Sequence, residues 1–231
     1  MLVSHTKKFI FLKTVKTAGT SVEIFFEEFC TPNKKEYAHG EQHRESWVSE
    51  YGIVGARGLM KKRWIKPRFY NHMPARELRK KLGRGVWDEY FKFTVCRNPY
   101  DALVSQFWFS HKSQAVEMLG SDPEKIYVKF RQWLQKPRNN PNSHVYLIDG
   151  EVAVDFFIRF EDLAQGLKDV CERLGIDKRI SNLQGFNSGI RPKAHVLDSV
   201  PPYFDPASIE IVRGLYPFEL SSLGYSLDDV S

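Results

Sequence analysis

Near the start of the chain, the apolar residues change from a strand-like run to the spacing of a helix face. Residues 9–15 form a short β-prone run between lysines. Residues 21–29 carry a valine and three phenylalanines at the spacing of one helix face. The residues between these two segments are therefore predicted to be a strand-to-helix turn.

A second unit of the same kind is predicted further along. Residues 73–83 have a proline near their start and a glycine at their end, which is typical of a helix. Residues 90–109 begin as an apolar strand, and Asn98-Pro99 interrupts it and starts another helix. A further helix is predicted over residues 125–134.

The last third of the chain again alternates between strand and helix patterns. Residues 144–163 predict a hairpin that turns at Asp149-Gly150, followed by a strand. Residues 161–175 and 206–225 have a helical period. No element is predicted within residues 30–70, which are polar and irregular.

Strands that alternate with helices predict an α/β fold with a central, mainly parallel sheet flanked by helices. Ligands of such sheets bind at the carboxyl ends of the strands. The 231 residues contain no internal repeat and no linker-like segment, so a single domain over residues 1–231 is expected.

Composition narrows the class of protein. Hydrophobic residues make up 42% of the chain, which excludes a disordered protein, and the net charge of +6 favours an anionic ligand. A phosphorylated or sulfated compound fits that charge, and so does nucleic acid. The three cysteines lie in apolar patterns without a CxxC pair, which indicates buried thiols in a reducing compartment. With no signal peptide or long apolar stretch evident, a soluble cytoplasmic protein is expected.

The first strand-to-helix turn is the first candidate site. Backbone N–H groups at a helix start attract anions, Lys16 adds a full charge, and nearby hydroxyls add donors. A nucleoside triphosphate P-loop is excluded because none of the 15 glycines is followed by lysine. An ordinary helix start remains the alternative. The candidate binding residues are Lys16, Thr17, Ala18, Gly19, Thr20 and Ser21.

The sequence K-T-A-G-T-S after a strand resembles the 5′-phosphosulfate loop of the sulfotransferases, which use 3′-phosphoadenosine 5′-phosphosulfate (PAPS). The stretch "CRNPYDALVSQF" resembles the 3′-phosphate motif of the same family, with Arg97 and Ser105 as the phosphate contacts. Arginine suits a bidentate phosphate contact, and Pro99 suits the first position of a helix. Asp101 is expected to cap that helix or to hold Arg97. A surface arginine and a solvated serine are the alternative.

The resemblance extends over nearly the whole chain and is weakest at residues 30–70 and 110–145. It points to the carbohydrate-type and bacterial branch, similar to 2-O-sulfotransferases, and implies a fold like that of the P-loop kinases. One departure is Val15, because this branch often has proline just before the loop lysine.

Lys16 is expected to stabilise the charge that develops on the leaving phosphate. His72 is expected to be the general base, since histidine titrates near neutral pH and the matching position resembles the catalytic histidine of that branch. A structural histidine is the alternative. Arg191 and Lys193 are candidate cofactor contacts, with solvated turn residues as the alternative. No metal is expected: His39 and His43 are four residues apart, but no third ligand is evident. The basic run 61–68 either guides an anionic acceptor or is a solvated face.

The sequence therefore predicts a PAPS-dependent sulfotransferase that moves a sulfuryl group to a hydroxyl, with a carbohydrate as the expected acceptor. Neither nucleic acid nor a membrane is an expected partner, and the sequence does not indicate an oligomeric state. Two alternatives remain open, namely a nucleotide-dependent kinase of related fold and a noncatalytic module that binds polyanions.

Overall fold

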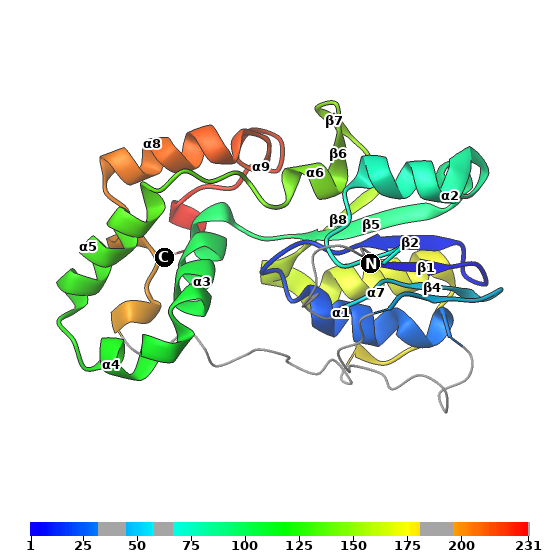
Figure 1. Cartoon of the computed structure of the whole chain (residues 1–231), viewed down its shortest axis with the longest axis horizontal. Helices are drawn as coiled ribbons and strands as arrows, with labels where there is room; N and C mark the ends of the chain where they lie inside the picture. Colours follow the sequence, from blue (N-terminus) through cyan, green and yellow to red (C-terminus); the bar gives the residue numbers. More distant parts are fainter. Residues whose placement is uncertain (32–44, 58–66, 181–195, 231) are drawn as a thin grey trace. The chain divides into compact units, whose positions relative to one another are not determined.

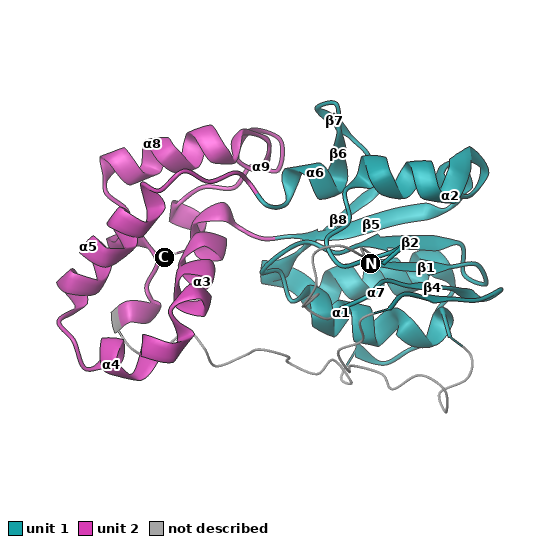
Figure 2. Ribbon diagram, viewed as in Figure 1, with its two compact units in different colours: residues 1–96, 141–186 teal, residues 97–140, 187–231 magenta. Residues whose placement is uncertain are grey.

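The computed structural model describes residues 1–31, 45–57, 67–180 and 196–230, and the chain forms two compact units (Figure 2). Unit 1 comprises Met1–Cys96 and Pro141–Phe186, and unit 2 comprises Arg97–Asn140 and Asn187–Ser231. The chain thus passes between the units three times, at Arg97, at Pro141 and at Asn187. The expectation of a single domain stays a prediction.

Unit 1 is an α/β unit (Figure 1). Its strands within the described residues are β1 (Leu2–Ser4), β2 (Phe9–Leu12), β3 (Trp47–Val48), β4 (Gly52–Val54), β5 (Phe91–Cys96), β6 (Leu147–Ile148), β7 (Glu151–Val152) and β8 (Phe156–Arg159). Its described helices are α1 (Gly19–Phe26), α2 (Ala75–Glu89), α6 (Ser143–Tyr146) and α7 (Leu163–Leu174), with a 3₁₀ turn (Glu27–Phe29) after α1.

The main sheet has the strand order β3-β4-β1-β2-β5-β8. β2, β5 and β8 are parallel, as predicted, and Leu12 pairs with Thr94 at the carboxyl ends of β2 and β5. β1, β3 and β4 pair antiparallel, so the sheet is mixed and not mainly parallel. The difference arises because β1 and β2 are joined by a tight turn, which permits only antiparallel pairing.

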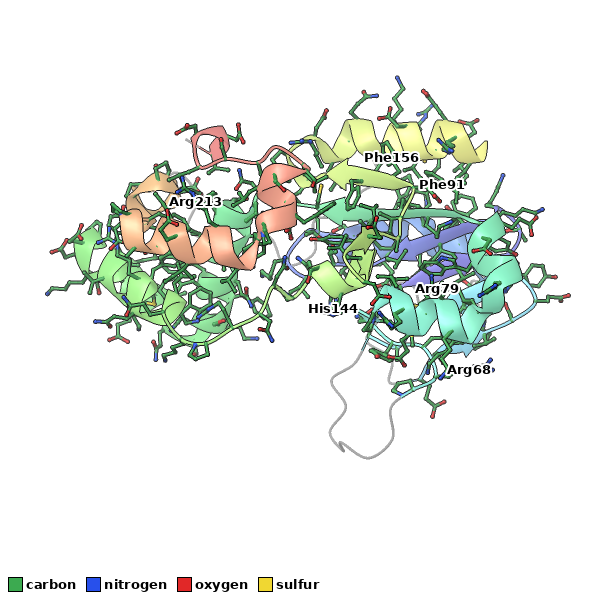
Figure 3. The ribbon with its side chains drawn as sticks, turned by 90° about the horizontal axis from the view of Figure 1, so that it is seen from above. Arg68, Arg79, Phe91, His144, Phe156 and Arg213 are labelled. Carbon is green, nitrogen blue, oxygen red and sulfur yellow. The ribbon has the colours of Figure 1, made fainter. Side chains whose placement is uncertain are left out.

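Helices cover both faces of this sheet, with α1 and α7 on one side and α2 and α6 on the other (Figure 1). Phe9, Phe11 and Phe93 pack with α1 and α7 in one apolar core. Ile10 and Leu12 point the opposite way and are also buried, as expected for a strand covered on both faces. Figure 3 shows Phe91 and Phe156 where β5 and β8 begin, with their ring centroids 6.4 Å apart.

Several predicted elements are confirmed with shifted ends. α2 continues past Gly83 to Glu89, because Gly83 takes a φ of 80° and forms a kink instead of a stop. The hairpin of β6 and β7 turns at Asp149 and Gly150, with φ values of 57° and 86°. Asn98 caps the helix after β5, and Pro99 is its first residue.

Unit 2 is helical in its described part. Its helices are α3 (Pro99–Ser110), α4 (Ala115–Leu119), α5 (Pro123–Leu134), α8 (Pro206–Leu215) and α9 (Pro217–Ser221). α3, α5 and α8 enclose an aromatic core in which Trp108 Nε1 donates to the Tyr203 hydroxyl over 2.9 Å. That hydroxyl donates in turn to the Leu197 carbonyl, so the buried polar groups of the core are paired.

Candidate functional site

The Lys16 loop, residues 13–18, joins the carboxyl end of β2 to α1. Two of its non-glycine residues are left-handed, with φ of 62° at Lys16 and 55° at Ala18. This conformation costs an L-residue about 1–2 kcal/mol, so the loop is strained. From residue 16 to residue 21, partly exposed and buried positions alternate. Lys16, Ala18 and Thr20 are partly exposed, and Thr17, Gly19 and Ser21 are buried.

The start of α1 is suited to an anion. Ala18 occupies the cap position without a side-chain cap bond, because alanine has no oxygen to accept from the first-turn N–H groups. Those groups and the positive end of the helix dipole favour negative charge beside them. Gly19 is required by packing, since a Cβ there would lie 2.8 Å from Lys13 Cγ.

β5 fixes the beginning of the loop. Thr14 Oγ1 donates to the Val95 carbonyl over 2.5 Å and lies 2.7 Å from the hydroxyl of Thr17. Thr94 Oγ1 donates to the Leu12 carbonyl over 2.6 Å. The Thr17 side chain therefore anchors the loop to the sheet instead of projecting from it.

Asn142 holds the loop at Val15 from a distant part of the sequence. The Val15 N–H donates to Asn142 Oδ1 over 2.7 Å, and Asn142 Nδ2 donates to the Val15 carbonyl over 3.2 Å. Proline has no N–H, so a proline at position 15 would lose the first of these bonds. The side-chain amide of Asn142 thus fixes the backbone of Val15, which a proline at this position would not fully allow.

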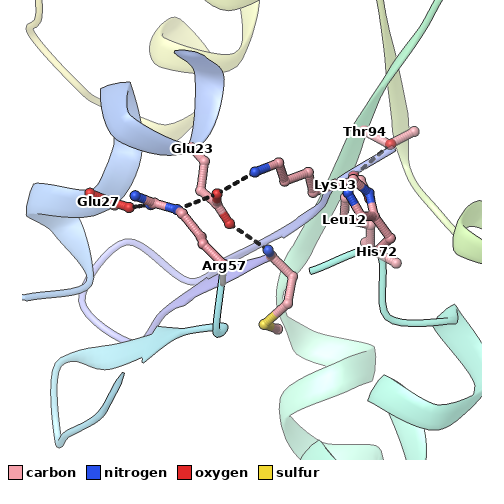
Figure 4. Close-up of polar contacts among 8 residues, drawn as sticks. Leu12, Lys13, Glu23, Glu27, Arg57, His72 and Thr94 are labelled. Carbon is pink, nitrogen blue, oxygen red and sulfur yellow. Dashed lines mark hydrogen bonds and ion pairs between the residues drawn. The ribbon is translucent and has the colours of Figure 1, made fainter. Parts of the chain in front are cut away.

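A buried network of charges lies behind the loop (Figure 4). Glu23 of α1 is fully buried, and its Oε2 is 2.7 Å from both Lys13 Nζ and Arg57 Nε. The amino group of Met1 is 2.6 Å from Oε1, and Arg57 also pairs with Glu27. Burial tends to raise the pKa of Glu23, but these positive charges outweigh it and lower the pKa. Glu23 therefore stays ionised.

His72 lies against the same segment and is also left-handed, with φ of 57°. Its Nδ1 is 3.1 Å from the Lys13 carbonyl (Figure 4). Because a carbonyl oxygen can only accept, Nδ1 carries the proton, and Nε2 holds the lone pair of the neutral ring. Burial and the nearby Lys13 ammonium lower the pKa of His72 to about 4. The ring is therefore neutral at pH 7 and able to accept a proton.

The Arg97 turn, residues 97–101, follows β5 directly and opens unit 2. Asn98 Oδ1 accepts from the Tyr100 N–H over 3.0 Å, and Asn98 Nδ2 donates to the Ser226 carbonyl over 2.7 Å. Arg97 Nε is 2.6 Å from Asp101 Oδ2. Of the two roles expected for Asp101, it therefore holds Arg97, and Asn98 supplies the cap.

Ser105 is four residues beyond Asp101 on α3 and is partly exposed. Residues at this spacing lie on one face of a helix, so Arg97, Asp101 and Ser105 form one polar group within unit 2. The structure likewise brings the Lys16 loop together with His72 within unit 1.

Other predicted residues lie outside the part that the structure describes. Arg191 and Lys193 are among them, as are His39, His43 and most of the basic run 61–68. Within the described ranges, no group of three or more His, Cys, Asp or Glu residues is placed to hold a metal ion. In the same ranges, no helix combines the length and apolar character needed to span a bilayer.

Sequence reasoning missed the residues that support the site. Four residues were not predicted as ligand contacts and yet support the loop, from positions up to 127 residues away in the chain. They are Lys13, Glu23, Arg57 and Asn142. The one local signal of this network is the order of charges in "KTVKTAGTSVEIFFEE", where two lysines are followed by three glutamates. Nothing near Asn142 in the sequence indicates its partner.

Comparisons with known proteins show the family of this chain. A model described as "Sulfotransferase family" matches residues 1–226. A protein of Archaeoglobus fulgidus, described as uncharacterized, is 24% identical over 113 residues, which is 47% of this chain and 87% of that protein. No solved structure shows a significant match. Because the family match includes both the Lys16 loop and the Arg97 turn, and nearly all of the chain around them, this protein belongs to the sulfotransferase family.

Proposed function

We propose that the protein transfers a sulfuryl group from PAPS to a hydroxyl group, with a carbohydrate as the acceptor. One observation carries the proposal. The strained loop that contains Lys16 leads into a helix start without a capping side chain, and the neutral ring of His72 contacts the Lys13 carbonyl of the same loop. An anion site and a proton acceptor are thus built on one strand end.

The Lys16 loop is proposed to hold the 5′-phosphosulfate of the donor. The N–H groups from Ala18 to Ser21, at the start of α1, are the proposed donors, together with Lys16 Nζ and the Thr20 hydroxyl. Thr17 contributes through its backbone, since its side chain is buried and within 2.7 Å of the Thr14 hydroxyl. When bound, the donor supplies an activated sulfuryl group on a phosphate leaving group.

His72 is proposed to accept the proton of the acceptor hydroxyl at Nε2. The acceptor oxygen then forms the new bond to sulfur, and the bond from sulfur to the phosphate oxygen breaks. The products are a sulfate ester, adenosine 3′,5′-bisphosphate (PAP) and one proton, which leaves from His72. Lys16 stabilises the charge that develops on the departing phosphate oxygen. Negative charge near His72 raises its pKa, so a bound donor strengthens it as a base.

Arg97 and Ser105 are proposed to bind the 3′-phosphate. A guanidinium suits a bidentate contact with phosphate, and Arg97 Nε donates to Asp101 Oδ2. That bond also fixes the plane of the guanidinium, which favours a bidentate contact. Arg191 and Lys193 remain proposed contacts of the same ligand.

The carbohydrate acceptor rests on the resemblance to the carbohydrate-type branch and on the net charge of +6, which suits an anionic glycan. A cytoplasmic location is proposed because the three cysteines are buried and form no disulfide.

The test is transfer of radioactive sulfur from labelled PAPS to a panel of neutral and anionic oligosaccharides, with hydroxylated peptides and small alcohols for comparison. We expect labelled sulfate esters on a carbohydrate, and loss of label transfer in Lys16→Ala and His72→Gln. Transfer to a peptide or small alcohol alone would refute the carbohydrate acceptor. Magnesium-dependent ATP turnover, or binding of polyanions without PAPS affinity, would instead establish one of the two alternatives.

A further inference from the structure

Asn142 contacts Val15 of the Lys16 loop through both groups of its side-chain amide. Its Oδ1 accepts from the Val15 N–H at 2.7 Å, and its Nδ2 donates to the Val15 carbonyl at 3.2 Å. The N–H belongs to the peptide plane between residues 14 and 15, and the carbonyl belongs to the plane between 15 and 16. The two bonds therefore fix both peptide planes that flank Val15.

The second of these planes bears directly on Lys16. The φ angle of Lys16 is the rotation about its N–Cα bond relative to this peptide plane, and it is 62°. An L-residue left to itself relaxes to negative φ. Relaxation of Lys16 by rotation of the 15–16 peptide would turn the Val15 carbonyl away from Asn142 Nδ2 and break that bond. Asn142 therefore opposes the loss of the left-handed conformation.

We propose that Asn142 is a positioning residue that keeps Lys16 in the left-handed conformation in which the loop binds the 5′ group of the donor. The inference rests on the proposed function, because it assigns Asn142 to the 5′ side of the PAPS site. Asn142 acts through Val15 and not by contact with the ligand.

A neighbouring asparagine provides a matched control. Asn140 is buried, and its Nδ2 donates to Glu219 Oε1 over 2.6 Å within unit 2. Asn140→Ala removes the same chemical group two residues away, together with its bond to Glu219. Asn142→Asp is a second, nearly isosteric variant. It keeps an oxygen for the Val15 N–H but has no N–H for the Val15 carbonyl.

The experiment is calorimetric titration of the full chain with PAP and with adenosine 3′-monophosphate, which differ only in the 5′-phosphate. The ratio of the two affinities reports the contribution of the loop. We expect Asn142→Ala to reduce this ratio by about tenfold, since two hydrogen bonds that hold the loop are lost. Binding of the 3′-monophosphate should change by less than about twofold. Asn142→Asp should reduce the ratio as well, and Asn140→Ala should leave it unchanged even if its melting temperature falls.

The outcomes separate the inference from the proposed function. An unchanged ratio in both Asn142 variants would overturn the positioning role. An equal loss of affinity for both ligands would also overturn it, because a general structural defect would explain that result. If wild type itself binds PAP no better than the 3′-monophosphate, the proposed donor site fails, and the inference fails with it. If wild type has the preference and the variants keep it, only the inference fails.

Discussion

The Lys16 loop and the Arg97 turn follow neighbouring parallel strands, but different kinds of contact hold them. The Arg97 turn begins its helix with neighbours in sequence, because Asn98 caps α3, Pro99 starts it, and Asp101 pairs with Arg97 four residues away. The Lys16 loop is held from elsewhere in the chain by β5, by Asn142 and by a buried network of charges.

This difference follows from backbone strain. A regular helix start needs only a cap and a suitable first residue, and both can be encoded locally. A loop with two left-handed non-glycine residues relaxes unless other contacts hold it. Substitutions far from the Lys16 loop should therefore damage it, whereas the Arg97 turn should respond mainly to its own residues.

The largest effect is expected at Glu23. Glu23→Gln leaves the buried Lys13 without its counter-charge and leaves Arg57 with Glu27 alone, and it should lower the free energy of unfolding by about 3–5 kcal/mol. The measurement is urea denaturation at pH 7. The control is Glu89→Gln, which breaks the exposed ion pair with Lys8 and should change stability little. Equal, small effects of both substitutions would contradict a supporting role for the network.

Lys16→Ala should reduce turnover about 10²–10³-fold, because a charge placed where the leaving group develops negative charge is lost. The measurement is the single-turnover rate with labelled PAPS. Lys8→Ala is a matched control, since Lys8 is also a left-handed lysine, with φ of 50°, but lies in the turn between β1 and β2. Near-normal turnover in Lys16→Ala would refute its catalytic role.

The pH dependence of stability should carry a contribution from His72. Its pKa is about 4 in the folded protein and 6.5 in the unfolded chain, so between these values only the unfolded state binds the proton. Stability should therefore fall by about 3 kcal/mol as the pH drops from 6.5 to 4, and the contribution is fully present above pH 6.5. His72→Gln should lack this part of the slope in urea titrations across the range. The same slope in wild type and variant would show that His72 is not buried as described.

A smaller effect is expected at the Arg97 turn. Asn98→Ala removes the cap of α3 and should lower the free energy of unfolding by about 1–2 kcal/mol. Asp205, whose Oδ1 accepts from the Ser208 N–H, caps α8 in the same way, and Asp205→Ala is the comparison. Denaturation curves of both should show similar losses. A loss for Asn98→Ala as large as that for Glu23→Gln would remove the distinction between the two regions.

The same distinction explains what the sequence could predict of the fold. β2, β5 and β8 were predicted because they are apolar runs followed by helical periods, and the β6-β7 turn because Asp149-Gly150 suits left-handed positions. β1, β3 and β4 were missed, since they are two or three residues long and no turn signal such as Asp-Gly marks them. Gly52 is needed in β4 because a Cβ there would lie 2.2 Å from the Val3 carbonyl, a packing reason that no local pattern carries.

For the site, motifs indicated the residues that would face a ligand, including Lys16, His72 and Arg97. They could not indicate the residues that support these candidates, because Asn142 and Arg57 are far in the sequence from Val15 and Glu23, the residues that they contact. The tautomer of His72 likewise depends on the Lys13 carbonyl, and its lowered pKa depends on burial and on the nearby Lys13 ammonium.

The most direct test of the central claim is calorimetric titration with PAP, ADP and ATP, on wild type and on Arg97→Ala. The account predicts that wild type binds PAP far more tightly than ADP or ATP, and that Arg97→Ala loses this preference because the 3′-phosphate loses its bidentate partner. Equal binding of the three nucleotides by wild type, or no binding of any, would contradict the assignment of PAPS as the donor.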